Sequence, residues 1–145
     1  MTDFQITDDL PPLLPEGRYQ FEFEAYETAL MVFGGAKVPK LVLHFKVTDQ
    51  SKYEGLGLRR FYNVRKLISA PGANGKFAVS GMGEFAREYF RLFPDSTSRL
   101  DRLAMSNFKA TKIIGEVESV TRARGQDIPR PLQYSRISRL LEVEQ

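Results

Sequence analysis

The sequence contains no cysteine and no tryptophan, and His44 is its one histidine. Without cysteine, disulfide scaffolds, thiolate zinc sites, iron–sulfur clusters and a cysteine nucleophile are excluded. A Ser-His-Asp arrangement would have to use His44, and a lone histidine on a strand is usually structural. We therefore predict that the protein is not an enzyme and that it uses no metal and no cofactor.

Carboxylates that could hold a metal are scattered along the chain. Glu116 and Glu118 share one face of a predicted strand, and Asp8 and Asp9 are adjacent near the N-terminus. Neither pair has the spacing of a metal-binding loop. A nuclease that binds Mg²⁺ through dispersed carboxylates such as Glu116 and Glu118 therefore ranks lowest among our functional hypotheses.

Long hydrophobic runs are also missing. No stretch approaches the roughly 18 consecutive apolar residues of a membrane span. The acidic start MTDFQITDDL lacks the basic and apolar regions of a signal peptide. A chain of 145 residues suits a single domain. We expect a soluble cytoplasmic protein that does not contact a membrane.

The distribution of charge is informative although the net charge is only +3. Residues 1–34 carry one basic residue against seven acidic ones, a net charge of −6, while residues 35–145 carry 20 against 11, a net charge of +9. A basic segment of this size is typical of a protein with a polyanionic partner. The alternative is that the acidic start neutralises the basic remainder within one fold.

The first half of the chain predicts an irregular arm followed by strands. Three prolines in PPLLPEG disfavour helix and sheet over residues 1–16. Alternating apolar and polar residues then predict strands over residues 18–31, 38–48 and 56–66, and Gly34-Gly35 predicts a turn between the first two. The segment SAPGANG, residues 69–75, predicts a loop.

The second half predicts helix and then strand. Apolar residues spaced by three and four predict a helix that begins at Ser80 or Gly83 and that Pro94 ends. Residues 98–105 predict a second, short helix, and residues 107–122 and 133–143 predict two more strands. Gly115, in the middle of the fourth strand, predicts a bulge or a sharp bend.

This order predicts a mainly β fold. We expect a five-stranded β-barrel of the OB-fold type, with one or two helices between the third and fourth strands. Residues 1–16 form an acidic, proline-rich N-terminal arm, and residues 17–145 form a single OB-like domain. An open sheet packed on the helix is the alternative.

Basic and aromatic residues alternate in the third strand, in the sequence RRFYNVRK. Either face of such a strand presents cations and one ring, which is what single-stranded nucleic acid requires for phosphate contacts and base stacking. The alternative is a core aromatic residue flanked by solvated charges. The candidate binding residues on this strand are Arg59, Arg60, Tyr62 and Arg65.

Two loops of the predicted barrel add further candidates. The loop between the last two strands and the strand after it are rich in arginine, which both pairs with phosphate and stacks on bases. The loop between the first two strands carries an aromatic ring beside two glycines. These are the two loops that commonly line an OB-fold cleft. The candidates are Arg122, Arg124, Arg130, Tyr134 and Arg136 in the last hairpin, and Phe33 and Lys37 in the first.

Several segments resemble the small OB-fold single-stranded DNA-binding proteins of phages and mobile elements. They are LPEGRYQFEFEAYE, LVLHFKV, YEGLGLRRFYNV and the closing pair IIGEVESVTR and LQYSRISRLL. The likeness covers roughly residues 14–142, and its motifs are loosely specific. The chain departs from many such proteins at its end, LLEVEQ, which is too short and mixed to be an acidic tail, whereas its acidic arm comes first.

The resemblance implies sequence-independent binding of single-stranded DNA in DNA replication or recombination. The residues themselves leave RNA open as an alternative ligand. The resemblance places a phage-encoded protein in the cytoplasm of the bacterial host. The sequence leaves the oligomeric state open, and a homo-oligomer is one alternative. The alternative from another class is a protein-interaction or accessory module of a phage or conjugation complex. The acidic arm suggests one further hypothesis, that it competes with DNA for the basic surface.

Overall fold

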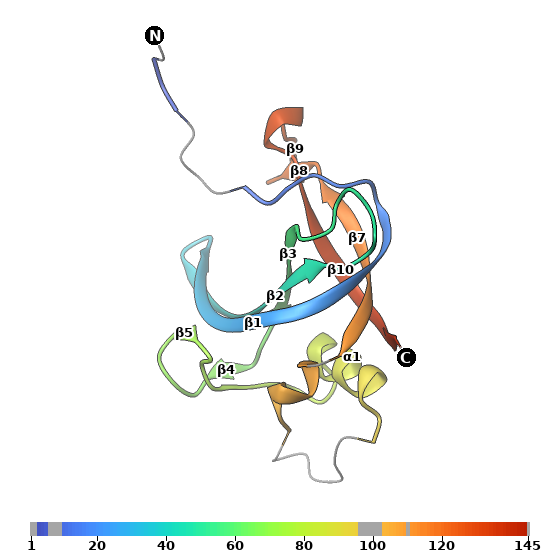
Figure 1. Cartoon of the computed structure of the whole chain (residues 1–145). Helices are drawn as coiled ribbons and strands as arrows, with labels where there is room; N and C mark the ends of the chain where they lie inside the picture. Colours follow the sequence, from blue (N-terminus) through green and yellow to red (C-terminus); the bar gives the residue numbers. More distant parts are fainter. Residues whose placement is uncertain (1–2, 6–9, 96–102, 110, 145) are drawn as a thin grey trace.

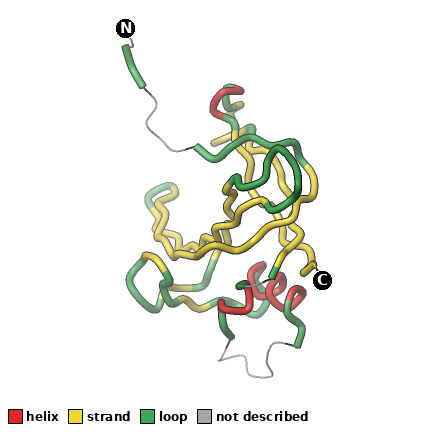
Figure 2. The backbone as a smooth tube through the Cα atoms, in the orientation of Figure 1, coloured by secondary structure: helices red, strands yellow, loops and turns green. Residues whose placement is uncertain are grey.

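The protein is mainly β. The computed structural model describes residues 3–5, 10–95, 103–109 and 111–144. Strands make up most of this backbone, and the α-helix of the described chain, α1 (Glu84–Leu92), lies at one end of the sheet (Figures 1 and 2). Within these residues no helix is long and apolar enough to cross a membrane.

Five long strands form one antiparallel sheet in the order β10-β7-β1-β2-β3. Neighbours in this order pair with fixed register, and only β7 and β10 lie far along the chain from the other three. The strands are β1 (Gly17–Phe33), β2 (Ala36–Val47), β3 (Gly57–Asn63), β7 (Lys112–Val120) and β10 (Tyr134–Glu144).

Short elements fill the connections. β5 (Gly72–Ala73) adds to β1, and β4 (Lys66–Leu67) pairs with β6 (Phe77–Ala78). β8 (Arg122–Ala123) and β9 (Gln126–Asp127) form a separate hairpin before the final strand. Two 3₁₀-helices complete the described chain, η1 (Met105–Phe108) and η2 (Arg130–Leu132).

The longest strand, β1, changes partners along its length and bends at a bulge. Its first residues, 17–22, pair with β7 on one side, and residues 27–28 pair with β5 on that same side farther along. A register shift between Phe23 and Ala25 marks a bulge opposite β2. A bulge increases local twist and bends the strand. The sheet is therefore strongly curved (Figure 1).

The tight β1–β2 turn confirms the prediction made from its two glycines. Gly34 and Gly35 have φ values of +55° and +85°. Only a residue without a side chain adopts this left-handed region at little cost, and two in a row suit the twist of a two-residue hairpin. The turn therefore fixes the register of the whole hairpin.

The core lies between the inner face of the sheet and α1. Alternate residues of the strands point inward, and the helix contributes Phe85, Tyr89 and Leu92 from one face. The spacing of three and four residues places these side chains on one stripe. The predicted helix is thus confirmed over residues 84–92, and it packs against the sheet beside β10 and β3.

Two expected boundaries are wrong. The fourth strand begins at Lys112 rather than at residue 107, because Met105–Phe108 forms η1 and buries Phe108 in the core. The short helix expected over residues 98–105 falls mainly outside the described residues. Its described end is not α-helical, since Ala104 has extended backbone and Met105 begins the 3₁₀-helix η1.

Gly115 has a different role from the bulge expected there. The strand opposite carries the register shifts, on either side of Leu140 in β10. A Cβ atom on Gly115 would lie 3.0 Å from the ring of Phe21 and 3.3 Å from Ile137. The glycine is therefore needed because the Phe21 ring packs directly onto the backbone of β7.

We predict that Gly115→Ala lowers the free energy of unfolding by about 1 kcal/mol. Overpacking of a core typically costs roughly 1–3 kcal/mol, and the reduced freedom of the unfolded chain returns part of it. Gly57→Ala is the matched control, because its Cβ would meet only the Phe45 carbonyl oxygen at 3.8 Å. Urea denaturation measures both, and equal stability of the two variants would contradict this role of Gly115.

The two edge strands of the sheet, β3 and β10, lie beside each other. Within the described backbone no hydrogen-bonded ladder joins them. The mainly β class with one helix between the third and fourth long strands is thus confirmed, whereas closure of the barrel by strand pairing is not observed. We call the line along which β3 and β10 meet the seam.

Candidate nucleic-acid interface

The basic and aromatic residues at the start of RRFYNVRK alternate between the two faces of β3. Leu58, Arg60 and Tyr62 point into the protein, with relative exposures of 1%, 6% and 1%. Arg59 and Phe61 lie on the outer face and are partly exposed. The guanidinium of Arg59 sits 5.8 Å from the centre of the Phe61 ring. The outer face therefore carries one cation and one ring side by side.

Arg60 and Tyr62 were expected in the binding surface, and the structure places both in the core instead. The guanidinium of Arg60 donates to both carboxylate oxygens of Glu88, to Glu84, and to the Phe61 carbonyl oxygen at 2.8 Å. It also lies 4.1 Å from the centre of the Tyr62 ring. Neither side chain is accessible to a ligand on the surface.

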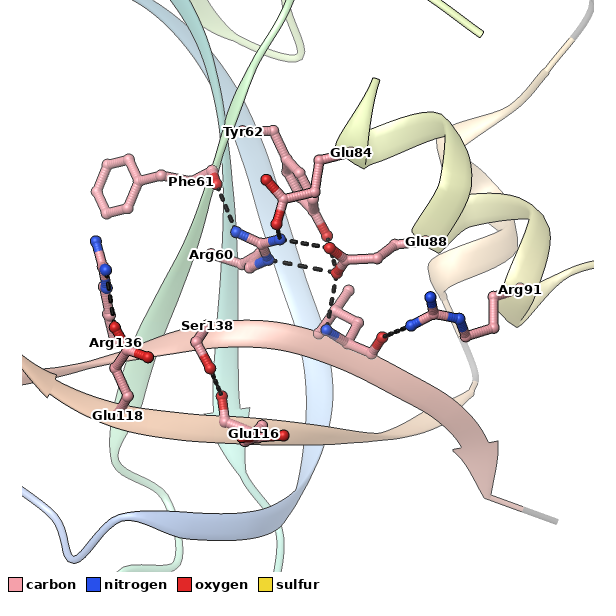
Figure 3. A network of polar contacts seen from close by, with 11 residues as sticks. Arg60, Phe61, Tyr62, Glu84, Glu88, Arg91, Glu116, Glu118, Arg136 and Ser138 are labelled. Carbon is pink, nitrogen blue, oxygen red and sulfur yellow. Dashed lines mark hydrogen bonds and ion pairs between the residues drawn. The ribbon is translucent and has the colours of Figure 1, made fainter. Parts of the chain in front are cut away.

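Glu88 is the centre of this buried network (Figure 3). One of its carboxylate oxygens accepts hydrogen bonds from the Tyr62 hydroxyl at 2.9 Å and from the Leu140 amide at 2.8 Å. Glu88 therefore joins α1 to β3 and to β10 at once. Arg91, one turn farther along α1, donates to the Leu140 carbonyl oxygen at 3.5 Å. Side chains of α1 thus take the place of strand partners at this end of the seam.

Burial and the hydrogen bonds of the network shift the pKa values of Arg60 and Tyr62. Burial by itself would lower the pKa of Arg60, but the hydrogen bonds and the charge of Glu88 outweigh burial and raise that pKa above its ordinary value. Burial raises the pKa of Tyr62 well above its ordinary value. Arg60 therefore stays charged and Tyr62 stays protonated, so both continue to donate hydrogen bonds.

The curvature of the sheet brings two distant basic segments together on the outside of the seam. Arg59 and Phe61 from β3 and Tyr134 and Arg136 from β10 line one hollow of about 270 Å³. We call these four residues the seam surface. Figure 3 shows the Phe61 ring and the Arg136 guanidinium on the same side of the sheet, away from α1.

Acidic side chains on β7 pair with the arginines of β10. Arg136 bonds to Glu118 at 2.9 Å, and Arg139 bonds to Glu116 at 3.0 Å. Both pairs are about half exposed, so solvent screens them and each contributes little to stability. The two glutamates are thus engaged as ion-pair partners, and among the described residues no three His, Cys, Asp or Glu side chains cluster as metal ligands.

At the β1–β2 hairpin the lysine beside the Phe33 ring is Lys40, and not Lys37, the predicted residue. Phe33 is 55% exposed. It pairs with Ala36, and because paired residues point to the same face of a sheet, the Phe33 side chain lies on the outer face. Lys37 follows Ala36 in β2 and therefore points to the opposite face of the sheet. Lys40 lies on the outer face instead, 5.4 Å from the centre of the Phe33 ring, and it bonds to Asn63 of β3. Lys40 therefore links the hairpin to the end of β3.

The remaining predicted residues lie around this surface without joining it. Arg122 donates to the Gly125 carbonyl oxygen at 2.7 Å and lies 3.6 Å from Asp127 within the β8–β9 hairpin. Arg124 occupies the exposed turn of that hairpin, with φ of +53°. Arg130, in η2, lines another hollow. Arg65 follows β3 and is exposed.

Glutamates of β1 lie on one side of the cations of β2 and β3. Glu22, Glu24 and Glu27 project from the strand β1, and Glu27 bonds to His44 of β2 at 2.9 Å. A polyanion is repelled by these carboxylates and attracted by the cations of β2 and β3. The cations of the outer face therefore lie over β2, β3 and the seam rather than over β1.

Three residues of this region escaped the sequence reasoning. Phe61 could have been chosen over Tyr62 from the alternation of the strand. Tyr62 lies on the same face as Leu58 and Val64, and these two apolar residues mark the core face. Glu88 carries a signal too, since a carboxylate stands within the apolar helical stripe. No sequence pattern indicated Lys40, because its position beside the Phe33 ring depends on the register in which β1 pairs with β2.

Comparisons of the chain with protein-family models, with curated proteins and with solved structures find no match.

Proposed function

We propose that the protein binds single-stranded DNA without sequence preference and is not an enzyme. The observation that carries this proposal is the seam surface, where Arg59 and Phe61 meet Tyr134 and Arg136 around one hollow. Cations that follow phosphates and flat rings on which bases stack are the two requirements for such binding. Phe33 and Lys40 extend the same outer face along the hairpin.

The OB-fold type is part of this proposal. Five antiparallel strands with a helix between the third and fourth support it, as does the position of α1 across one end of the seam. In that fold the binding cleft lies over the second and third strands, between the first hairpin and the last. The candidate residues of β3, β10 and the β1–β2 hairpin follow that course.

The proposed ligand is a single strand because the rings need open base faces. Phe61 and Tyr134 are only partly exposed, so they present a ring face or edge within a narrow hollow rather than a broad platform. A stacked duplex offers no such faces along its length, whereas unstacked bases do. RNA has the same requirement and is a second ligand to compare. The resemblance of the sequence to phage and mobile-element proteins makes replication or recombination in a bacterial cytoplasm the setting that we propose.

A titration across a salt series tests this function. We expect the protein to bind a thirty-nucleotide oligo-dT at low salt, and we expect the logarithm of the binding constant to fall linearly with the logarithm of the salt concentration, because phosphate contacts release counterions. Arg59→Gln should reduce the slope by about 0.7–1, the effect of losing one phosphate contact. Fluorescence anisotropy of a labelled oligonucleotide provides the measurement.

Arg87→Gln is the matched control, since Arg87 is exposed on α1, the helix that covers the inner face of the sheet. Its slope should equal that of the unsubstituted protein. Absence of binding at low salt would reject the function. The alternative would then be a protein-interaction module, which one observation favours: Leu30 and Val32, 46% and 66% exposed, form an apolar patch on the other face of the hairpin.

A further inference from the structure

Two residues of the N-terminal arm, Leu10 and Pro11, lie at the seam surface. Leu10 and Pro11 line the hollow of about 270 Å³ together with the four residues of that surface. The same two arm residues, with Pro12, line a second hollow of about 350 Å³ on the side of His44. Arg59 borders both hollows. Leu10 and Pro11 therefore lie beside Arg59, between the two hollows.

A separate set of contacts anchors the arm just beyond these two residues. The Ser135 amide donates to the Pro12 carbonyl oxygen at 2.9 Å, and the Leu14 amide donates to the Ser135 hydroxyl oxygen at 2.7 Å. The hydroxyl in turn donates to the Leu14 carbonyl oxygen at 3.2 Å. Leu14 is 2% exposed, whereas Leu10 is 40% exposed. The anchor is thus buried, and the segment before it is held more loosely.

We propose that Leu10 and Pro11 form a strap that occupies the nucleic-acid site until single-stranded DNA displaces it, while the anchor at Pro12 and Leu14 stays in place. This inference rests on the proposed function. Strap and DNA exclude each other because both require the space beside Arg59 and Phe61. The occupant is an intramolecular peptide, so its effective concentration is high without any partner.

The chemistry of the arm suits a competitor of DNA. Asp3, Asp8 and Asp9 precede the strap in the sequence, so the chain attached to the apolar strap carries charge of the same sign as the phosphates. Pro11 and Pro12 restrict the backbone, which lowers the conformational entropy lost when the strap is bound. A site that is open for only a fraction of the time shows an apparent affinity reduced by that fraction.

Two readouts test the strap independently of each other. The first uses Phe61→Trp, which introduces the chain's one tryptophan at the seam surface. In that background, Leu10→Gly with Pro11→Gly should shift the emission to longer wavelength in the absence of DNA, because the apolar cover is removed. The second uses the native Phe61, where the same double substitution should tighten oligo-dT binding by about five- to tenfold at low salt.

Leu13→Gly is the matched control. Leu13 belongs to the same arm and is 41% exposed, but it lines the hollow beside Arg130 rather than the seam surface. It should change neither the emission nor the affinity. Unchanged emission in the double variant would overturn the strap whatever the protein binds. Changed emission with unchanged affinity would overturn competition while leaving DNA binding intact, and absence of oligo-dT binding in every variant would overturn the proposed function and competition together.

Discussion

Glu88→Ala is expected to lower the free energy of unfolding by about 3–5 kcal/mol, the largest effect that we predict for a single side chain. Glu88 is 3% exposed and accepts hydrogen bonds from Arg60, Tyr62 and the Leu140 amide. Its removal leaves the buried guanidinium without its main counterion, and breaking a buried pair in this way typically costs that amount. Denaturation in urea, followed by circular dichroism, provides the measurement.

Glu84→Ala is the control for this prediction. Glu84 bonds to the same guanidinium, but its side chain is 58% exposed. An ion pair open to solvent contributes roughly 0–1 kcal/mol, so a small loss is expected. Equal losses for the two variants would show that Glu88 is not the counterion that holds the network.

A double replacement separates charge compensation from packing. Arg60→Met combined with Glu88→Leu removes both buried charges and keeps side chains of similar volume. Apolar replacement of a buried pair is often neutral or stabilising, so this variant should recover much of the stability lost in Glu88→Ala. The Tyr62 hydroxyl and the Leu140 amide still lose their acceptor, which limits the recovery.

The sequence was sufficient for the parts of the fold that depend on local pattern. Period-two alternation located the long strands, the glycine pair located the first turn, and the apolar stripe located α1. Each of these signals reflects a local physical constraint: burial of one strand face, a left-handed backbone, or burial of one helix face. The start of β7 could not be located in this way, because η1 is held by the burial of Phe108 in the core.

The candidate site depends on contacts between segments far apart in the chain. Arg59 and Arg136 were both predicted to bind DNA, but only the curvature of the sheet brings their strands together at the seam. The inward direction of Arg60 is a second nonlocal result. An arginine is rarely buried without a partner, and that partner, Glu88, comes from a helix that packs across β3. Sequence alone could not join these two residues.

Phe61→Ala should weaken the binding of oligo-dT about 5- to 150-fold at low salt. Base stacking on one aromatic ring contributes roughly 1–3 kcal/mol, and each 1.4 kcal/mol corresponds to a factor of ten in affinity. The Phe61 ring lies on the outer face beside Arg59 and lines the hollow at the seam. Its loss therefore removes both a stacking partner and a neighbour that orients the cation. Anisotropy of a labelled oligonucleotide measures the affinity.

The neighbouring residue provides the contrast, because Tyr62 is 1% exposed and faces the core. Tyr62→Phe deletes the hydroxyl that donates to Glu88, and it should lower the free energy of unfolding by roughly 1 kcal/mol while leaving the affinity for oligo-dT unchanged. If Phe61→Ala binds as tightly as the unsubstituted protein, the ring does not stack on bases. If Tyr62→Phe alone weakens binding, the ligand contacts a face of β3 that the structure places against α1. The two variants differ by one position along the same strand, so together they determine which face of β3 the nucleic acid uses.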